Sequence, residues 1–344
     1  MKATFFKHTL QFKQASGTSR GVLTLKDTWF IKLENNILKG IGECGMFKGL
    51  SIDHRDDFEL KLKWTCQNID LGLEVLLGQL VSFPSIQFGL EMAFASLNNK
   101  SPFELFPSEF TKGKDSIPIN GLIWMGESSF MKQQIKDKLE GGFSCIKLKI
   151  GALDFETELA LLKSIRNEYD MQTIEIRIDA NGAFKPNEAL EKLKQLSDYN
   201  LHSIEQPINQ GQIDDMAQLC LDTPIPIALD EELIGIFSVT NKQFLLQTIK
   251  PQYIILKPTL VGGFKGSQQW IDVAESNKIG WWVTSALESN IGLNAIAQWT
   301  YTLNNTLPQG LGTGGLFTNN VQAPLVVRSG RLFYDLKTKW NLKF

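Results

Sequence analysis

Five charged residues each end a short apolar run, and successive members are 25 to 30 residues apart: Lys149, Asp179, Glu205, Asp230 and Lys257. Three carboxylates in one pocket repel one another unless a cation lies among them. Oxygen ligands without a cysteine or histidine pair favour Mg²⁺ over Zn²⁺. A lone acid at a strand end more often caps a helix or pairs with a surface lysine, but three at equivalent positions favour a metal. We therefore predict that the three acids bind Mg²⁺, which Mn²⁺ can replace.

Two lysines share one apolar run, the stretch FSCIKLKIG at residues 143–151. Along a strand, alternation directs Lys147 and Lys149 to the same face. A positive charge beside a lysine favours its neutral amine, so Lys147 would make Lys149 available as a base near neutral pH. Lys257 would flank the metal from the opposite side. A lone lysine in a strand is usually solvated, but the apolar neighbours of Lys149 and Lys257 indicate buried strands.

A divalent metal with a lysine base suits one reaction, the removal of a proton from the carbon next to a carboxylate. The metal can hold the charge of the resulting enediolate, and most of the barrier to this step must be lowered electrostatically. The expected partner is therefore a small-molecule carboxylate substrate. A Schiff-base aldolase would need only one desolvated lysine, but that reaction leaves the three acids unexplained.

Further residues are candidates for contact with such a substrate. Arg177 precedes the first acid by two residues, and it would either meet a substrate carboxylate or form a salt bridge in the barrel core to one of the three acids. Ser285 would contact the substrate or cap the chain locally. The stretch GLGTGG at residues 310–315 includes Gly312 and Gly314, whose backbone N–H groups would approach a carboxylate. The alternative for this stretch is an ordinary turn.

The charged residues belong to a repeated kind of segment. Apolar runs that end in a polar residue recur from about residue 117, at intervals that fit one strand plus one helix. They cover residues 117–126, 145–151, 174–182, 202–207, 225–232, 253–259 and 280–289. Helical periodicity over 154–169 and 185–199 fills two of the gaps.

This alternation of strands and helices predicts an α/β fold in which a parallel sheet closes into a TIM-like barrel. Catalytic groups are then expected at the C-terminal ends of the strands. An open, doubly wound sheet is disfavoured because no GxGxxG loop follows the first run.

The chain before the repeat has a different pattern. Residues 1–116 begin with strand-like alternation, and residues 84–97 have a helical pattern, which together predict a smaller α+β domain. With 344 residues, the chain is long enough to hold such a domain beside a barrel.

Composition limits the expected partners and compartment. A formal net charge of −2 gives no reason to expect nucleic acid as a partner. Four scattered cysteines without a CxxC pair are expected to be reduced thiols. The first residues lack the long apolar segment of a signal peptide or membrane span, so we expect no membrane partner and a cytoplasmic protein.

Five motifs resemble, in their order and spacing, those of the enolase superfamily, in its muconate-lactonising-enzyme-like subgroup. They are KLK, IDANG, IEQP, ALDE and LKPTLVGG. The resemblance covers essentially the whole chain. It implies a (β/α)7β barrel at residues 117–319 under an α+β capping domain made of residues 1–116 and 320–344.

The same resemblance implies roles for the charged residues. It assigns Lys149 as the principal acid and base and Lys257 as the opposing lysine. It assigns the Mg²⁺ ligands as Asp179, Glu205 and Asp230. A lysine base beside Mg²⁺ is a general arrangement of enolase-superfamily sites.

Three segments resemble the family members that dehydrate 2-succinyl-6-hydroxy-2,4-cyclohexadiene-1-carboxylate to 2-succinylbenzoate in menaquinone biosynthesis. These segments cover residues 18–33, 284–299 and 308–320. In such members one lysine takes the proton and then assists the departure of hydroxide from the same face of the ring. The opposing lysine stays cationic beside the ring. The resemblance therefore implies a metal-dependent hydro-lyase.

The main rivals are an N-succinylamino-acid racemase and a dipeptide epimerase, which use two lysines on opposite faces of the substrate. Epimerases of this family hold the dipeptide ammonium with acids after the last barrel strand, and no Asp or Glu lies between Glu288 and Asp335. A dipeptide is therefore disfavoured, whereas a neutral N-acyl group is not. A non-catalytic barrel retained for binding would be expected to have lost a ligand or a lysine, and none is missing.

Overall fold

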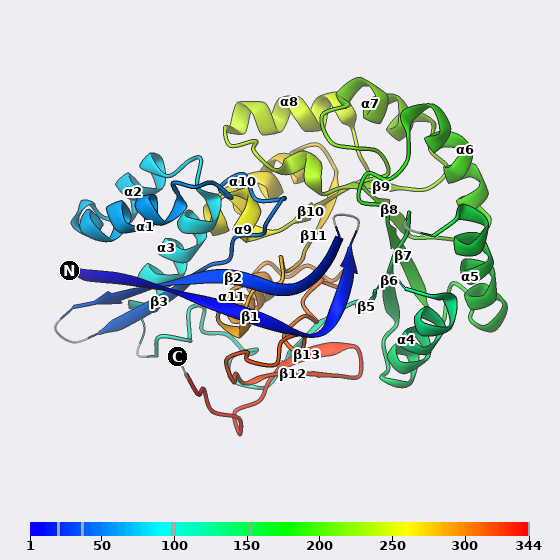
Figure 1. Ribbon diagram of the computed structural model, residues 1–344. Helices are drawn as coiled ribbons and strands as arrows, with labels where there is room; N and C mark the ends of the chain where they lie inside the picture. The colour runs from blue at the N-terminus through cyan, green and yellow to red at the C-terminus, as the bar shows by residue number, and fades with distance from the viewer. Residues whose placement is uncertain are drawn as a thin grey trace.

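A curved parallel sheet of seven strands forms the centre of the molecule, and neighbours in the sheet follow chain order (Figure 1). The computed structural model describes residues 1–18, 21–35, 38–97, 99, 101–124, 126–151 and 153–342. The strands are β5 (Gly121–Ile123), β6 (Cys145–Lys149), β7 (Glu175–Asp179), β8 (Ser203–Glu205), β9 (Ile227–Leu229), β10 (Tyr253–Leu256) and β11 (Gly280–Val283). Each predicted apolar run contributes one of these strands, so the predicted α/β class is confirmed.

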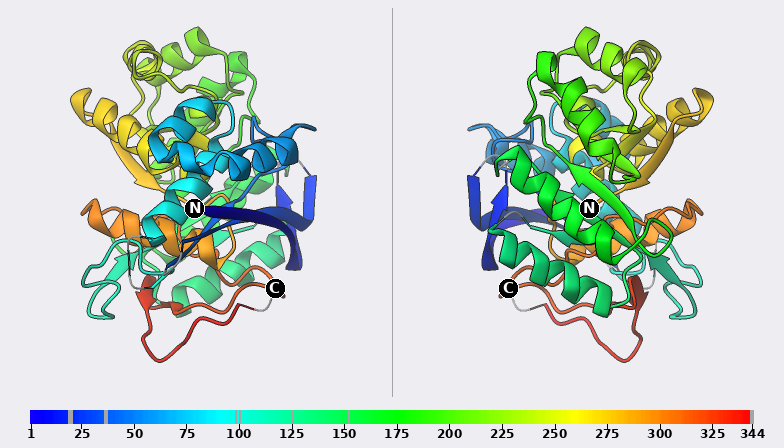
Figure 2. Two further views of the ribbon diagram at one scale, coloured as in Figure 1. Left: turned by 90° about the vertical axis from the view of Figure 1, so that its left-hand side faces the viewer. Right: turned by 90° about the vertical axis from the view of Figure 1, so that its right-hand side faces the viewer.

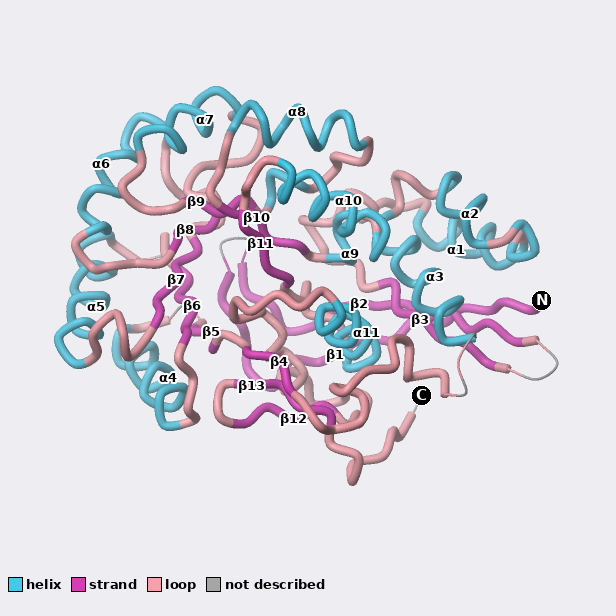
Figure 3. The backbone as a smooth tube through the Cα atoms, turned by 180° about the vertical axis from the view of Figure 1, so that it is seen from behind, coloured by secondary structure: helices cyan, strands magenta, loops and turns pink. Residues whose placement is uncertain are grey.

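Helices connect the strands, and α4 to α8 cover the outer face of the curved sheet (Figure 3). The connecting helices are α4 (Ser128–Glu140), α5 (Phe155–Glu168), α6 (Pro186–Ser197), α7 (Ile213–Asp222), α8 (Val239–Ile249), α9 (Pro258–Val261), α10 (Gly263–Ser276) and α11 (Asn290–Thr302). Helix α5 begins where the Asp154 carboxylate accepts a hydrogen bond from Thr157 N–H, and α6 begins at Pro186. Within the described ranges, no helix combines the length and apolar character that crossing a membrane requires.

A short extended segment closes the barrel where an eighth full strand is expected. Gly310 N–H donates to Val283 C=O (2.8 Å) at one edge of the sheet. At the other edge, Gln309 N–H donates to Pro118 C=O (2.8 Å), and Asn120 N–H donates to Gln309 C=O (3.0 Å). The predicted (β/α)7β barrel therefore has its last strand position filled by two residues.

The first predicted run, 117–126, forms two elements instead of one strand. Within it, β4 (Ser116–Pro118) pairs with β13 (Arg331–Tyr334), which forms a hairpin with β12 (Leu325–Arg328). Only β5 pairs with the barrel strand β6. The chain passes from the small sheet to the barrel at Asn120, which bonds to the closing segment.

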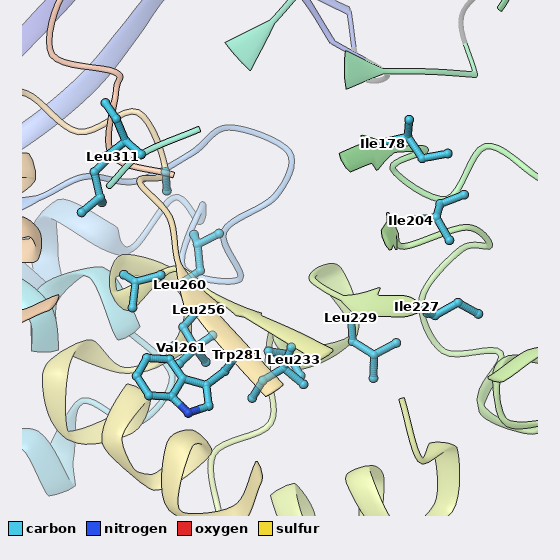
Figure 4. Close-up of a cluster of buried hydrophobic side chains, with 14 of the residues drawn as sticks. Ile178, Ile204, Ile227, Leu229, Leu233, Leu256, Leu260, Val261, Trp281 and Leu311 are labelled. Atoms are coloured by element: carbon cyan, nitrogen blue, oxygen red, sulfur yellow. The ribbon is translucent and has the colours of Figure 1, made fainter. Parts of the chain in front are cut away.

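Apolar side chains on the outer face of the barrel strands form the main core. Figure 4 shows Ile178, Ile204 and Leu229 on three neighbouring strands, and all three are fully buried. Burial of such a side chain contributes about 1.5 to 3 kcal/mol. Because successive side chains in a strand alternate between faces, this outer layer directs the intervening charged side chains into the barrel.

An antiparallel sheet and three helices make up the N-terminal part of the chain, as predicted. The helices gather at the end of the molecule where the N-terminus lies (Figures 1 and 2). The elements are β1 (Lys2–Thr18), β2 (Gly21–Glu34), β3 (Lys39–Cys44), α1 (Phe58–Gln67), α2 (Leu73–Gln79) and α3 (Pro84–Leu97). Gly42 allows β3 to approach α3, since a Cβ there would lie 1.8 Å from the Gly89 carbonyl oxygen. Ser19 and Arg20, in one of the resembling segments, lie outside the described residues.

Candidate active site

The register of the barrel strands brings the predicted charged residues to one level. Lys149 on β6 lies beside Asp179 on β7, and Asp179 lies beside Glu205 on β8. Asp230 directly follows β9, and Lys257 directly follows β10. All five residues therefore stand at the C-terminal ends of consecutive parallel strands, the end at which barrel enzymes place their chemistry.

Ion pairs connect the three lysines to the three acids. The Lys147 and Lys149 ammonium nitrogens each lie 2.9 Å from Asp179 Oδ2. Lys147 also pairs with Glu205. On the other side Lys257 pairs with Asp230 and lies 4.0 Å from Glu205 Oε1. The side chains are at most 14% exposed, so these charges act on one another with little screening by water.

This mutual contact changes the pKa values of the buried groups. Burial alone would raise the pKa of Asp179, but Lys147 and Lys149 hold that pKa well below its usual range. Burial raises the pKa of the Glu205 carboxyl, and the negative charge of Asp179 raises it further. Burial would lower the pKa of Lys147 and of Lys257, but the surrounding carboxylates outweigh it and raise both values. Among the three acids, Glu205 is therefore the one whose charged form is disfavoured by its surroundings.

The donor set fits a hard divalent cation by its chemistry. Buried Glu205 Oε1 accepts no hydrogen bond from the described residues, and a cation would supply the missing partner. In the described part of the chain, no three His, Cys, Asp or Glu side chains lie close enough together to hold a metal, and lysine ammonium groups lie between the acids. The assignment of Asp179, Glu205 and Asp230 as ligands therefore stays a prediction.

Two further polar residues at this level were missed by sequence reasoning. The Asn181 side-chain oxygen accepts a hydrogen bond from Lys149 Nζ (2.6 Å), and its Nδ2 donates to Glu231 Oε1 (3.1 Å). Asn181 has φ of 45°, a left-handed conformation that asparagine tolerates better than most residues. The sequence could have indicated both residues, because Asn181 follows the predicted ligand Asp179 by two positions and Glu231 directly follows Asp230.

A cavity of about 640 Å³ opens at these strand ends. Its wall contains the three lysines and Asp179, and the N-terminal part of the chain contributes Phe47 and Leu50. It also contains the predicted substrate-contacting residues Ser285, Gly312 and Gly314. A cavity of this size is ample for a small carboxylate.

The hydroxyl of Ser285 already has several local partners. It donates to Glu288 Oε2 (2.6 Å) and accepts from Leu287 N–H (3.0 Å) and from the Thr313 hydroxyl (2.9 Å). A Cβ on Gly314 would lie 2.7 Å from Asn290 Oδ1, so tight packing already accounts for a glycine there. The substrate contacts predicted for Ser285, Gly312 and Gly314 remain predictions.

Arg177 does not reach this cavity, and the prediction that it meets a substrate carboxylate is wrong. Its side chain is 2% exposed, with Nε donating to Glu175 Oε1 (2.7 Å) and Nη1 donating to Pro308 C=O (2.9 Å). The guanidinium also lies 4.3 Å from the ring centre of Trp282. The alternative, a barrel-core salt bridge to one of the three predicted ligands, is right about the core salt bridge but wrong about its partner, which is Glu175.

Fold and site together define an α/β barrel, with a separate N-terminal antiparallel sheet and with lysines facing carboxylates at the strand ends of the barrel. The family model described as "Enolase C-terminal domain-like" matches residues 131–335. The chain therefore belongs to the enolase superfamily, as its motifs predict.

Individual members of the superfamily are similar to this chain over nearly its whole length. The chain is 46% identical to the o-succinylbenzoate synthase of Desulfotalea psychrophila, over 96% of this chain and 98% of that protein. It superposes on the crystal structure of MenC from Desulfotalea psychrophila with a TM-score of 0.87 at 43% identity, covering 97% and 99% of the two chains. A dipeptide epimerase from Enterococcus faecalis, complexed with Mg and the dipeptide L-Leu-L-Tyr, superposes with a TM-score of 0.83 over 96% of each chain. At 19% identity, the epimerase shows the shared fold alone.

Proposed function

We propose that this chain is an o-succinylbenzoate synthase, a hydro-lyase of menaquinone biosynthesis that converts 2-succinyl-6-hydroxy-2,4-cyclohexadiene-1-carboxylate to 2-succinylbenzoate. The observation that carries the proposal is the contact of Lys149 with Asp179 and Asn181 in the wall of a cavity large enough for the ring. Full-length similarity of 46% to the Desulfotalea psychrophila synthase supports it.

The chain's own residues carry out the proton transfers in this proposal. Lys149 removes the proton from the carbon next to the ring carboxylate, and its ammonium then returns a proton to the departing hydroxide on the same face, which leaves as water. The C–H electron pair becomes a ring double bond as the C–O bond breaks, and the ring becomes aromatic. Lys257 remains cationic on the opposite side of the ring.

Three acids would hold the metal that this reaction uses, Asp179, Glu205 and Asp230. When bound, Mg²⁺, or Mn²⁺ in its place, supplies positive charge that stabilises the developing negative charge of the substrate carboxylate. Lys147, which pairs with Asp179 and Glu205, would orient these acids and keep a second positive charge beside Lys149.

A capping role for the N-terminal part completes the proposal. Residues 1–116 and 320–344 would form the cap over the barrel at residues 117–319. Phe47 and Leu50 in the cavity wall support this division, because they place cap side chains against the substrate space. Exclusion of water by such a cap strengthens the electrostatic interactions of the lysines. Scattered cysteines without a disulfide among the described residues support a cytoplasmic location.

An N-succinylamino-acid racemase is the second candidate, because Lys149 and Lys257 contact the acids from opposite ends of the cluster. Such an arrangement suits removal and return of a proton on opposite faces. A dipeptide epimerase is less well supported, since the chain after Glu288 offers no acid for a substrate ammonium before Asp335.

A panel of three substrates separates these candidates. Purified protein with Mg²⁺ is incubated with the cyclohexadiene substrate, an N-succinylamino acid or a dipeptide. Loss of ultraviolet absorbance reports dehydration, and α-proton exchange in D₂O reports racemisation or epimerisation. The proposal expects rapid loss of absorbance. Unchanged absorbance together with fast exchange in either of the other arms would transfer the assignment to racemase or epimerase.

A further inference from the structure

Lys26 on β2 is a buried cation outside the active-site cluster. It is 7% exposed, and its ammonium makes no hydrogen bond with the described residues. Burial lowers the pKa of Lys26, while the charges of Glu43 and Glu288 act in the opposite direction. Both of these carboxylates are fully buried. Glu43 belongs to the same N-terminal sheet as Lys26, whereas Glu288 follows the last barrel strand, so the three charges bridge the two parts of the chain.

Glu43 joins the N-terminal sheet to the start of helix α11. Its Oε1 accepts hydrogen bonds from the Thr28 hydroxyl (2.9 Å) and from Ser289 N–H (2.8 Å). Its Oε2 accepts from Gly292 N–H (2.8 Å) and from the Ser289 hydroxyl. Glu43 is therefore held by groups of both parts of the chain at this junction.

Glu288 connects the same junction to the catalytic wall. It accepts hydrogen bonds from Ser285, which lines the cavity, and from Thr259. Thr259 follows the active-site Lys257 by two residues. A shift of Glu288 would therefore move the two chain segments that present Ser285 and Lys257 to the substrate.

Glycines leave the space in which these charged groups meet. A Cβ on Gly45 would lie 3.3 Å from Lys26 Nζ, 3.4 Å from Glu288 Cγ and 3.6 Å from Glu43 Oε1. A Cβ on Gly292 would lie 2.8 Å from both Glu43 Oε2 and Glu288 Cβ. Gly45 follows the N-terminal sheet and Gly292 belongs to α11. The lack of a side chain at each glycine leaves room for both Glu43 and Glu288.

We infer that Lys26 is a positioning residue of the proposed reaction, because its ammonium holds the cap's Glu43 and the barrel's Glu288 together and thereby fixes the segments of Ser285 and Lys257. Without the cation, two buried carboxylates face each other across the junction and repel. The cap then loosens from the strand ends, and the substrate loses part of its enclosure. The inference rests on the proposed function, because the effect of these segments on the substrate is measured through turnover.

The test compares Lys26→Met with Lys39→Met, a substitution of a lysine in the same sheet that is 78% exposed and pairs with Glu34 at the surface. Turnover by the wild-type protein tests the proposed function by itself. The variants are then assayed with the substrate of the panel that the wild-type protein converts. Lys26→Met is expected to raise KM and lower kcat/KM by about tenfold relative to Lys39→Met. Lys26→Arg is expected to restore part of this loss.

A double-mutant cycle makes the test independent of folding losses. Glu288→Gln and Lys26→Met/Glu288→Gln complete the cycle, and the charge-balanced double variant remains informative if Lys26→Met fails to fold. The expected result is that Lys26→Met costs less activity in the Glu288→Gln background than in wild type. Equal costs in both backgrounds, or a Lys26→Met variant whose Tm falls while kcat and KM match those of Lys39→Met, would overturn the inference.

Discussion

Arg177 and Asp179 leave the same strand on the same face, two residues apart, yet they lie in different surroundings. Asp179 lines a cavity with lysines from two chain segments, Lys147 and Lys149 on β6 and Lys257 after β10. Arg177 lies one layer deeper, where Glu175, the Pro308 carbonyl and the Trp282 ring enclose it. The upper layer therefore combines opposed charges with open space, and the lower layer combines a charge pair with close packing.

The contrast shows what distinguishes a chemical site from a structural one inside a barrel. Both layers contain groups with perturbed pKa values. In the lower layer burial is the main cause, and it lowers the pKa of His202 and raises that of the Cys145 thiol. The upper layer joins such charges to a cavity, whereas Arg177 and Glu175 are not part of the wall of that cavity. Changes in the upper layer should therefore affect turnover, and changes in the lower layer should affect stability.

Metal removal should have the largest effect, and it should be confined to the upper layer. Because charge stabilisation by a metal is worth several kcal/mol, treatment with EDTA should lower dehydration by about a thousandfold or more. Addition of Mg²⁺ or Mn²⁺ should restore it. The measurement is the rate of absorbance loss before and after metal is returned. Full activity in extensively chelated protein would contradict the assignment of Asp179, Glu205 and Asp230 as ligands.

Substitution of Lys257 should give the next largest effect and should separate synthase from racemase. If Lys257 contributes only positive charge, Lys257→Ala should lower kcat by about a hundredfold, and Lys257→Arg should retain most of the rate. Steady-state kinetics of both variants on the cyclohexadiene substrate check this. Equal loss in the two variants would indicate that Lys257 transfers a proton.

Arg177→Met should act in the opposite way, on stability and not on substrate binding. Loss of the pair with Glu175 should lower the free energy of unfolding by about 3 to 5 kcal/mol, the usual cost of breaking a buried ion pair from one side. Urea unfolding measures the change, and KM measured in the folded range should stay at the wild-type value. Lys194→Met is the control, because its partner Glu191 is exposed and surface pairs contribute about 1 kcal/mol or less. A raised KM in Arg177→Met would contradict the assignment of a purely structural role to the lower layer.

Glu91 offers the smallest effect, at a buried carboxyl that belongs to neither layer. Burial raises its pKa from 4.5 to about 7, although it accepts hydrogen bonds from Phe264 N–H and Lys265 N–H at the start of α10. The folded state therefore binds this proton more tightly than the unfolded state, so stability falls as pH rises from 4.5 to about 7. The change should be at most about 3 kcal/mol.

Unfolding curves of wild type and Glu91→Gln, recorded between pH 4.5 and about 7, measure this change in stability. The difference in stability between the two proteins should shift in favour of Glu91→Gln as pH rises, because glutamine does not titrate. A difference that stays constant over this range would show that Glu91 does not titrate there in the folded protein.

Sequence patterns predict which strands form and which face each side chain takes, but not how deep that side chain lies. Alternation predicts that the side chains of Arg177 and Asp179 both point into the barrel. They differ because Asp179 lies in the cavity wall, whereas Arg177 lies one layer deeper, below the cavity. The closing segment at 309–310 escapes prediction because two residues carry no periodicity. The group of Lys26 and Glu288 escapes it as well, since their contact joins residues far apart in the chain.

The central claim is that the upper lysine cluster dehydrates the cyclohexadiene carboxylate through Lys149. One assay tests it most directly: loss of ultraviolet absorbance by wild type and by Lys149→Ala, side by side with Mg²⁺, after circular dichroism has confirmed that both are folded. Rapid loss is expected with wild type, and a rate at least about a thousandfold lower is expected with the variant. Equal rates in the two proteins would contradict it.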